Sequence, residues 1–76
     1  MTTFFIKLNT IEEVRRFVNI VSRYDHEIDL KSGRYLVDAK SIMGIFSLDL
    51  MNKIEVTVHA ENCDELVKEL GDIVVE

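Results

Sequence analysis

Apolar and polar residues alternate at the start of the chain and then change to a helical spacing. From Thr3 to Leu8 every second side chain is large and apolar, which predicts a strand with one buried face. Apolar residues then recur at helical intervals, which predicts a helix from Ile11 to about Arg23. Thr10, with a glutamate three residues later, forms a capping box at its start. The apolar positions of this helix are Ile11, Val14, Phe17, Val18 and Val21.

The middle of the chain contains two short alternating runs. Glu27 to Lys31 and Arg34 to Ala39 predict two strands. Ser32-Gly33 between them predicts a tight hairpin, because glycine supplies the positive φ that such turns need. We expect Tyr35 and Val37 of the second strand to point inward.

The last third of the chain predicts one more strand and one more helix. Lys53 to Ala60 alternates again, and a helix is expected to start at Asn62 or Asp64. Gly71 follows its apolar positions and predicts its end. Residues 72–76 are rich in β-forming Ile and Val, which favours a strand or an extended segment over a helix, and its place in the fold stays open.

The predicted order is strand, helix, strand, strand, helix, strand, helix. Four strands with helices laid on one face form a two-layer α+β open-faced sandwich, which suits a chain too short for three layers. A chain of 76 residues has room for one core, so residues 1–76 are predicted to form a single domain.

The segment from Lys40 to Met51 carries the main functional signal. It contains seven large apolar residues, and its only interior charge is Asp49. A two-turn helix on a small domain buries one stripe of its surface, so some of these side chains are expected to face a partner. Ser41 stands at the N-cap of this helix.

The apolar side chains of this helix divide into two sets. Ile42, Met43 and Phe46 lie on the side opposite Ile45 and Leu48, so one set can be buried while the other is exposed. We interpret Met43 and Phe46 as interface residues, and the flexible methionine side chain suits a surface that accommodates several partners.

Composition and charge exclude several classes of function. The net charge is -5 and the nine basic residues are dispersed, which argues against a nucleic-acid partner. No apolar stretch is long enough to span a bilayer and no secretory signal precedes the first strand, so we expect a cytoplasmic protein without a membrane partner. The single cysteine, Cys63, is interpreted as an ordinary reduced thiol.

Lys40-Ser41-Ile42-Met43-Gly44 resembles the regulatory-serine motif of HPr, the histidine-containing phosphocarrier protein of the bacterial sugar phosphotransferase system. The resemblance extends without gaps from about Val21 to about Leu50, and more loosely to Glu65. It implies an antiparallel sheet in which the fourth strand lies beside the first.

The chain departs from this family at the phosphate-carrying site. The family has a Leu-His-Ala-Arg-Pro-Ala run at the start of the first helix, and the corresponding stretch here is Asn9 to Val14. Thr10 falls where the histidine should be, Glu12 where the arginine should be and Glu13 where the proline should be. A glutamate repels a phosphate that an arginine would hold. We therefore predict a degenerate phosphocarrier site at Thr10, Glu12 and Glu13.

The resemblance implies that Ser41 is a regulatory phosphorylation site. An added phosphate would bring about two negative charges to the edge of an apolar surface, and Lys40 could pair with it. In the family, the exposed side of this helix contacts enzymes and a transcriptional regulator. The predicted partner-binding residues are thus Lys40, Ile42, Met43 and Phe46, with an HPr kinase-like enzyme or a transcriptional regulator as the candidate partner.

Two alternative functions stay open at this point. One is a phosphocarrier that uses another acceptor, such as His59 or Thr10, and the other is an interaction module without phosphorylation. Neither His26 nor His59 has a second ligand at metal-binding spacing, so no metal site or cofactor is predicted. The sequence contains no acid and base pair, Gly-rich phosphate loop or Ser-His-Asp arrangement that would indicate an enzyme.

Overall fold

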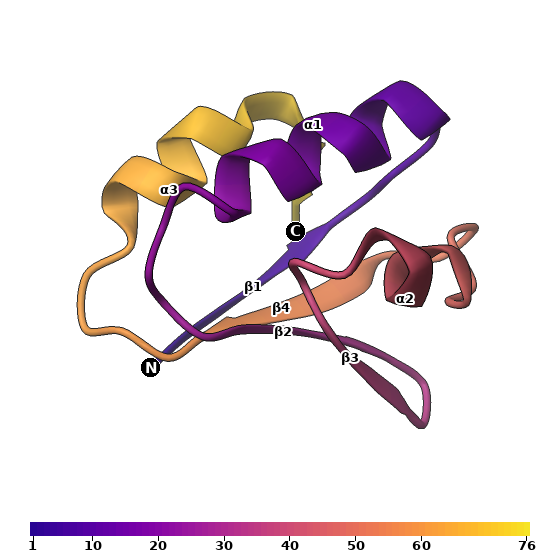
Figure 1. The fold of residues 1–76 in the computed structure, drawn as a ribbon, viewed down its shortest axis with the longest axis horizontal. Coiled ribbons are helices and arrows are strands. Elements are labelled where there is room, and N and C mark those ends of the chain that lie inside the picture. The colour runs from indigo at the N-terminus through magenta and orange to yellow at the C-terminus, as the bar shows by residue number, and fades with distance from the viewer.

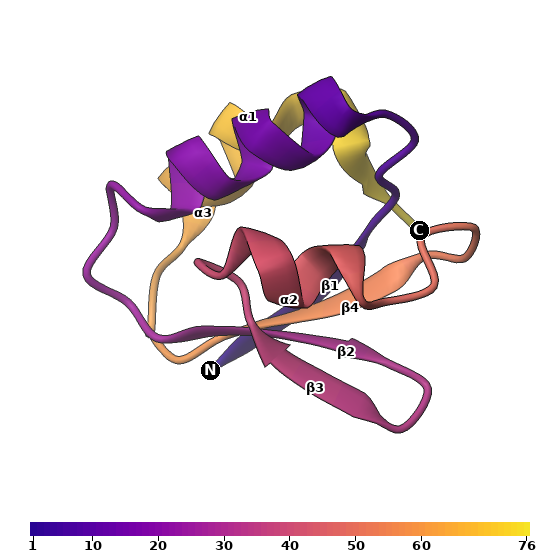
Figure 2. The same cartoon turned by 45° about the vertical axis from the view of Figure 1, so that its right-hand side comes forward.

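The computed structural model describes residues 1–76 as one antiparallel sheet with three α-helices on one face (Figures 1 and 2). The elements are β1 (Thr2–Ile6), α1 (Ile11–Val21), β2 (Ile28–Ser32), β3 (Tyr35–Asp38), α2 (Ile42–Phe46), β4 (Ile54–Val58), α3 (Asp64–Leu70), the 3-10 turn η1 (Gly71–Ile73) and β5 (Val74–Val75). The strands lie in the order β3-β2-β4-β1-β5. The predicted α+β open-faced sandwich is confirmed, and β4 lies beside β1 as the resemblance implied.

The sheet has five strands, so the prediction of four strands was wrong. The additional strand is β5, which pairs with the end of β1 through the register Ile6↔Val74. Just before it, the N–H of Lys7 donates to the carbonyl of Ile73 at 2.8 Å. The β-forming residues of the tail predicted an extended segment, but a strand of two residues is too short to show an alternation or to indicate its partner.

The core lies between the sheet and the helices and consists of 18 buried residues. None of the buried residues is polar or charged. The strands contribute Ile6, Ile28, Leu30, Ile54, Val56 and Val58, and the three α-helices contribute Val14, Phe17, Ile20, Val21, Ile45, Leu66 and Leu70. In β4 the alternating residues are buried, and in α1 the predicted apolar positions Val14, Phe17 and Val21 are buried, whereas Val18 is half-buried and Ile11 is exposed.

The edge strand β3 is less buried than the sequence predicted. Tyr35 was expected to point inward, but it is 63% exposed, and Val37 is half-buried. The register pairs Leu30 with Val37, so the helix side of β3 is as predicted. Alternation predicts which face of the sheet a side chain points to, but not whether a helix covers it there. α2 packs against β3 at Val37, next to Gly44, and leaves Tyr35 uncovered. Gly33 has φ +61°, as the hairpin requires.

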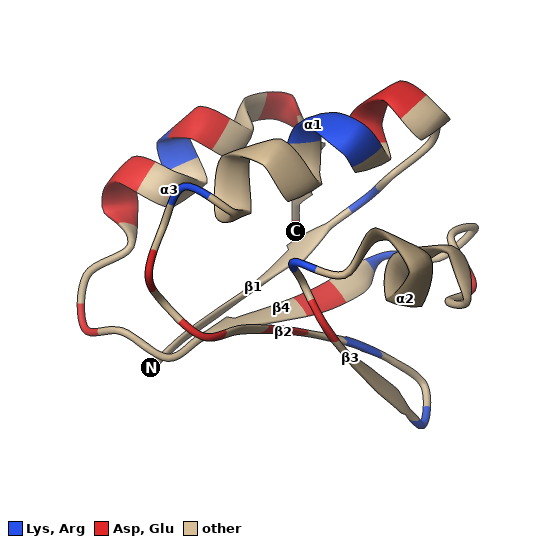
Figure 3. Ribbon diagram, in the orientation of Figure 1, with Lys and Arg blue, Asp and Glu red and all other residues tan.

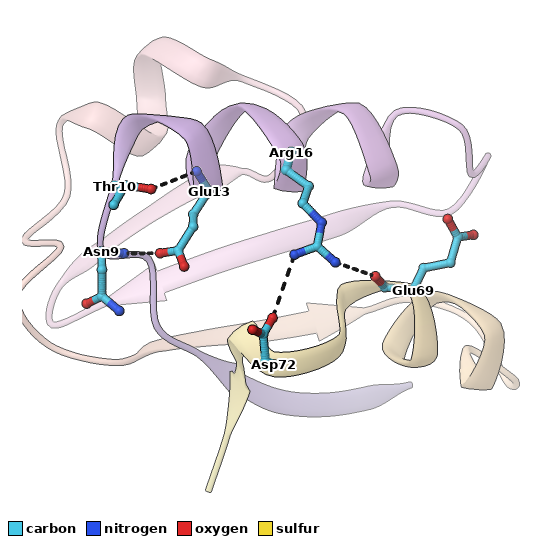
Figure 4. Close-up of polar contacts among 6 residues, drawn as sticks. All are labelled: Asn9, Thr10, Glu13, Arg16, Glu69 and Asp72. Carbon is cyan, nitrogen blue, oxygen red and sulfur yellow. Dashed lines mark hydrogen bonds and ion pairs between the residues drawn. The ribbon is translucent and has the colours of Figure 1, made fainter.

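Polar contacts of exposed side chains join α1 to the end of α3 (Figure 4). Arg16 Nη2 donates to the carbonyl of Glu69 at 3.1 Å, and Nη1 lies 3.7 Å from Asp72 Oδ1. The Glu69 carboxylate also accepts hydrogen bonds from Arg23 and Tyr24. Whereas α1 and α3 carry charges of both signs, α2 carries none (Figure 3). None of the helices has the length and apolar character that crossing a bilayer requires.

We expect Ile73→Ala to lower the free energy of unfolding by about 2 to 5 kcal/mol, because the substitution removes a buried side chain where η1 meets β5. Urea denaturation followed by circular dichroism measures this loss. Val75→Ala is the matched control, since Val75 is 36% exposed and its truncation should cost clearly less. Equal losses in the two variants would contradict the view that burial of Ile73 anchors the tail.

Candidate functional site

Ser41 caps α2 as the sequence predicted. Its backbone is extended, with φ −101° and ψ 102°, and its Oγ accepts a hydrogen bond from the N–H of Gly44 at 3.3 Å. The Ser41 side chain is exposed. A hydroxyl in this position is both a structural cap and a group that a partner or a modifying enzyme can reach.

α2 ends at Phe46, so the expected two-turn helix is shorter than predicted. Ser47 Oγ donates to the carbonyl of Gly44 at 2.6 Å, and Asp49 Oδ1 accepts from the N–H of Met51 at 3.0 Å. Serine and aspartate side chains compete with the backbone for hydrogen bonds and favour turns over a continued helix. The apolar residues after Phe46 therefore lie on a loop.

The two predicted faces of α2 are present in the structure. Ile45 is fully buried and Leu48 is 6% exposed, whereas Met43 is 77% and Phe46 is 43% exposed. Ile42 is half-buried and packs against the core. We refer to Lys40, Ile42, Met43 and Phe46 as the α2 patch.

Lys40 is held by a contact that the sequence did not indicate. Its Nζ donates to the backbone carbonyl of Tyr24 at 2.7 Å, in the segment between α1 and β2. Its own N–H donates to Asp38 Oδ1 at 2.8 Å. Lys40 therefore connects α2 to the end of α1 and is not a free cation.

Hydrogen bonds among Asn9, Thr10 and Glu13 cap the start of α1 (Figure 4). Thr10 Oγ1 accepts from the N–H of Glu13 at 3.1 Å, as the capping box predicted. The Glu13 carboxylate accepts from the N–H of Asn9 at 2.6 Å and not from that of Thr10. Glu12 is exposed. The nearby ammonium group of Lys7 is bonded to Asn9 Oδ1 at 2.8 Å and to the carbonyl of Leu50 at 2.9 Å.

An apolar groove joins the start of α1 to the α2 patch. Its volume is about 590 Å³, and six of its nine lining residues are hydrophobic. Thr10, Ile11 and Val14 line it from α1, and Phe46, Leu50 and Met51 line it from α2 and the following loop. The two separate sites that the sequence predicted, Thr10 and Phe46, thus belong to one surface.

Among the groove residues that sequence reasoning did not assign to a site, Ile11 and Met51 are the two most exposed apolar ones. Ile11 was counted among the apolar positions of the first helix by its spacing, but it is 63% exposed and lines the groove. Met51 was included in the predicted helix, but it lies on the loop and is 85% exposed. An apolar residue directly after an N-cap was the only signal in the sequence that could have identified Ile11.

Both histidines lie at the other end of the sheet from Thr10. His59 follows β4 and His26 precedes β2, whereas Thr10 follows the opposite end of β1, which is antiparallel to β4. His59 Nε2 lies 2.8 Å from Asp29 Oδ2 on the face without helices. His26 is half-buried, with its ring 5.9 Å from that of Tyr24.

The carboxylate of Glu69 perturbs the tyrosine whose carbonyl holds Lys40. The hydrogen bond between them raises the pKa of Tyr24 above its ordinary 10.0, and burial and the negative charge of Glu69 act in the same direction. The same hydrogen bond, with help from Arg23, lowers the pKa of Glu69 below 4.5. Both shifts favour the protonated phenol and the ionised carboxylate in the folded protein.

Comparison with known proteins identifies similar structures. A family model described as the PTS HPr component phosphorylation site matches residues 13–75, a range that includes Ser41 and begins after Thr10 and Glu12. HPr-C-His from Thermoanaerobacter tengcongensis matches with a TM-score of 0.79 and 26% identity, over 97% of this chain and 91% of that chain. HPr from Bacillus anthracis str. Ames matches with a TM-score of 0.73 and 23% identity, over 97% and 96%. Crh from Bacillus subtilis, described as a dimer with a swapped domain, matches with a TM-score of 0.64 and 23% identity, over 93% and 87%.

Tyr24→Phe is expected to destabilise the fold in a pH-dependent way. The lowered pKa of Glu69 means that the contact stabilises the folded state above pH 4.5 and that this contribution disappears as the pH falls through the folded-state pKa. The raised pKa of Tyr24 means that the contribution is complete below pH 10.0 and is lost at higher pH. Urea midpoints should therefore differ most between wild type and variant from pH 5 to pH 9, a range of about four units.

Tyr35→Phe is the control for this experiment, because Tyr35 is exposed and its hydroxyl makes no hydrogen bond within the chain. A difference between wild type and Tyr24→Phe that stayed constant into acid would show that the Glu69 contact has no linked protonation.

Proposed function

The chain belongs to the HPr family, and on that premise we propose that it is a regulatory protein that binds a protein partner through the α2 patch, under control of phosphorylation at Ser41. The observation that carries the proposal is the exposed N-cap hydroxyl of Ser41 beside the exposed side chains of Met43 and Phe46. In this role the chain performs no chemical step of its own and requires no cofactor.

The surroundings of Ser41 support a role as a charge switch. A phosphoserine carries a charge of about −1.5 to −2 at neutral pH. Here it would stand at the edge of an apolar surface, two residues before Met43, and next to Lys40. Lys40 would then have a choice between the phosphate and the carbonyl of Tyr24 that it now contacts. Phosphorylation would change which partners the α2 patch accepts.

The exposed apolar side chains support the docking role. Met43, Phe46, Ile11 and Met51 are all at least 43% exposed. The last three line one groove, and Met43 lies three residues before Phe46 on α2. Large apolar side chains gathered on one surface are typical of an interaction site, because their burial is favourable only on binding. The candidate partners are an HPr kinase-like enzyme, which would dock here before modifying Ser41, and a transcriptional regulator.

We also propose that the histidine phosphocarrier site is degenerate at Thr10, Glu12 and Glu13. Thr10 and Glu13 are engaged in capping α1, which accounts for both residues without a phosphoryl group. The nearby cation, Lys7, is already hydrogen-bonded to Asn9 and Leu50. A phosphate on Thr10 would therefore be repelled by Glu12 and Glu13 without a free cation to neutralise it. His59, the other candidate acceptor, is paired with Asp29 and lies at the opposite end of the sheet.

A bifunctional HPr kinase with ATP is expected to phosphorylate the chain at Ser41, because its hydroxyl is exposed and precedes an apolar docking surface. Phosphosite mapping by mass spectrometry measures this, and Ser41→Ala should remove the label. Ser47→Ala is the matched control, since Ser47 is an exposed serine at the other end of α2. Met43→Lys should lower kcat/KM for labelling about tenfold, which corresponds to about 1.4 kcal/mol of lost docking energy.

Leu36→Lys is the control for Met43→Lys, because Leu36 is a similarly exposed apolar residue on β3. If Ser41 takes no label, the phosphorylation half of the proposal is wrong. Unchanged labelling in Met43→Lys would instead show that α2 is not the docking surface.

No acid-labile phosphate is expected when the chain is incubated with phosphoenolpyruvate and the first enzyme of the phosphotransferase system, because no histidine lies at the start of α1. Phosphorus NMR or acid-lability of a radioactive label measures this. HPr with its active-site histidine serves as the positive control. A label on this chain that His59→Ala removes would favour the phosphocarrier alternative over the regulatory role.

A further inference from the structure

The strand β3 is a free edge of the sheet. It pairs with β2 alone, and Figure 1 shows no element on its other side. The N–H of Ala39 donates to Ile28, so alternation turns the backbone groups of residues 35, 37 and 39 toward β2. Those of Leu36 and Asp38 are turned away from β2, and of these only the Asp38 carbonyl is used, by the N–H of Ser41. A row of unpaired backbone groups is a template for another strand.

The side chains along this edge are complementary to those of an antiparallel copy of the same edge. Leu36 is 66% exposed, Asp38 stands two residues after it on the same face of β3, and Arg34 stands two residues before it in the hairpin turn. Figure 3 shows the corresponding basic position at the hairpin tip and the acidic position at the far end of β3. Neither Arg34 nor Asp38 has an ion-pair partner within the chain. Asp38 instead stands directly across from another carboxylate, Asp29.

We infer that β3 is a self-association edge, where a second copy of this chain pairs antiparallel about a two-fold axis at Leu36. In this register Leu36 faces the second copy's Leu36, and Arg34 faces the second copy's Asp38 twice. The register is consistent with the backbone, because the N–H and C=O groups of Leu36, at the centre, and the N–H of Asp38 are turned away from β2 and unused within the chain. A basic residue at one end and an acidic residue at the other make this edge complementary to an antiparallel copy of itself. This self-complementarity favours a second copy over an unrelated strand.

The resulting dimer is a continuous sheet of two five-stranded halves with all helices on one face. Its interface is one four-residue strand from each copy, much less than a stable interface requires, so the dimer is weak and sensitive to salt. The Arg34 pairs also relieve the repulsion between Asp38 and Asp29 within each copy. This inference does not rest on Ser41 or on the proposed function.

Sedimentation equilibrium of the full chain, up to millimolar concentration at low salt, is expected to show an average mass rising toward that of two chains. Arg34→Asp and Asp38→Arg should each weaken self-association about tenfold, since each turns both attractions into repulsions. An equimolar mixture of the two variants should form heterodimers, because one chain is then acidic and the other basic at both ends of β3. Lys68→Asp, an exposed charge reversal on α3, is the matched control and should associate like wild type.

Amide exchange by NMR provides a readout that does not depend on any variant. In the wild type, exchange at Leu36 should slow as concentration rises, while Val37, whose backbone already faces β2, should not change. A chain that stays monomeric at millimolar concentration would overturn the inference. So would association that persists in both charge-reversal variants, or that leaves Leu36 exchange unchanged, because another edge or an exchanged strand would then form the contact.

Discussion

The antiparallel pairing of β1 with β4 in the middle of the sheet determines where the candidate site lies. Ile6, at the end of β1, stands opposite Ile54, at the start of β4. The segment that leaves β1 toward α1 and the segment that enters β4 from α2 are therefore at the same end of the sheet. Lys7 joins them through its bond to the carbonyl of Leu50. Residues more than thirty positions apart in the sequence, such as Thr10 and Phe46, thereby line one groove.

The elements that the sequence predicted well are those with local physical signals. β4 shows a clean alternation of buried Ile54, Val56 and Val58, and α1 has both a cap at Thr10 and a helical spacing of apolar residues. The errors occurred where the outcome depends on distant parts of the chain. The pairing of β5 with β1 and the uncovered position of Tyr35 both follow from how elements assemble. Neither has a signature in the residues themselves.

The candidate site shows the same division between local and non-local features. The N-cap geometry of Ser41 and the exposure of Met43 follow from residues within one turn, and the sequence predicted both. The bond from Lys40 to the carbonyl of Tyr24 spans 16 residues and was not foreseen. The groove itself required the β1–β4 register. Sequence reasoning could thus name Thr10 and Phe46 as residues of two sites, but not that they line one groove.

The extended backbone at Ser41 has a consequence for how a phosphate would be recognised. An N-cap residue stands outside the helix, and this one is already exposed, so a phosphoryl group would fit without refolding of α2. The two forms of the protein would then have nearly the same shape and differ in electrostatic potential. At physiological ionic strength the screening length is about 8 Å, so that difference decays within a short distance of Ser41. A partner would have to place its own charges within that short radius to distinguish the two forms, and the rest of the domain would look identical to it.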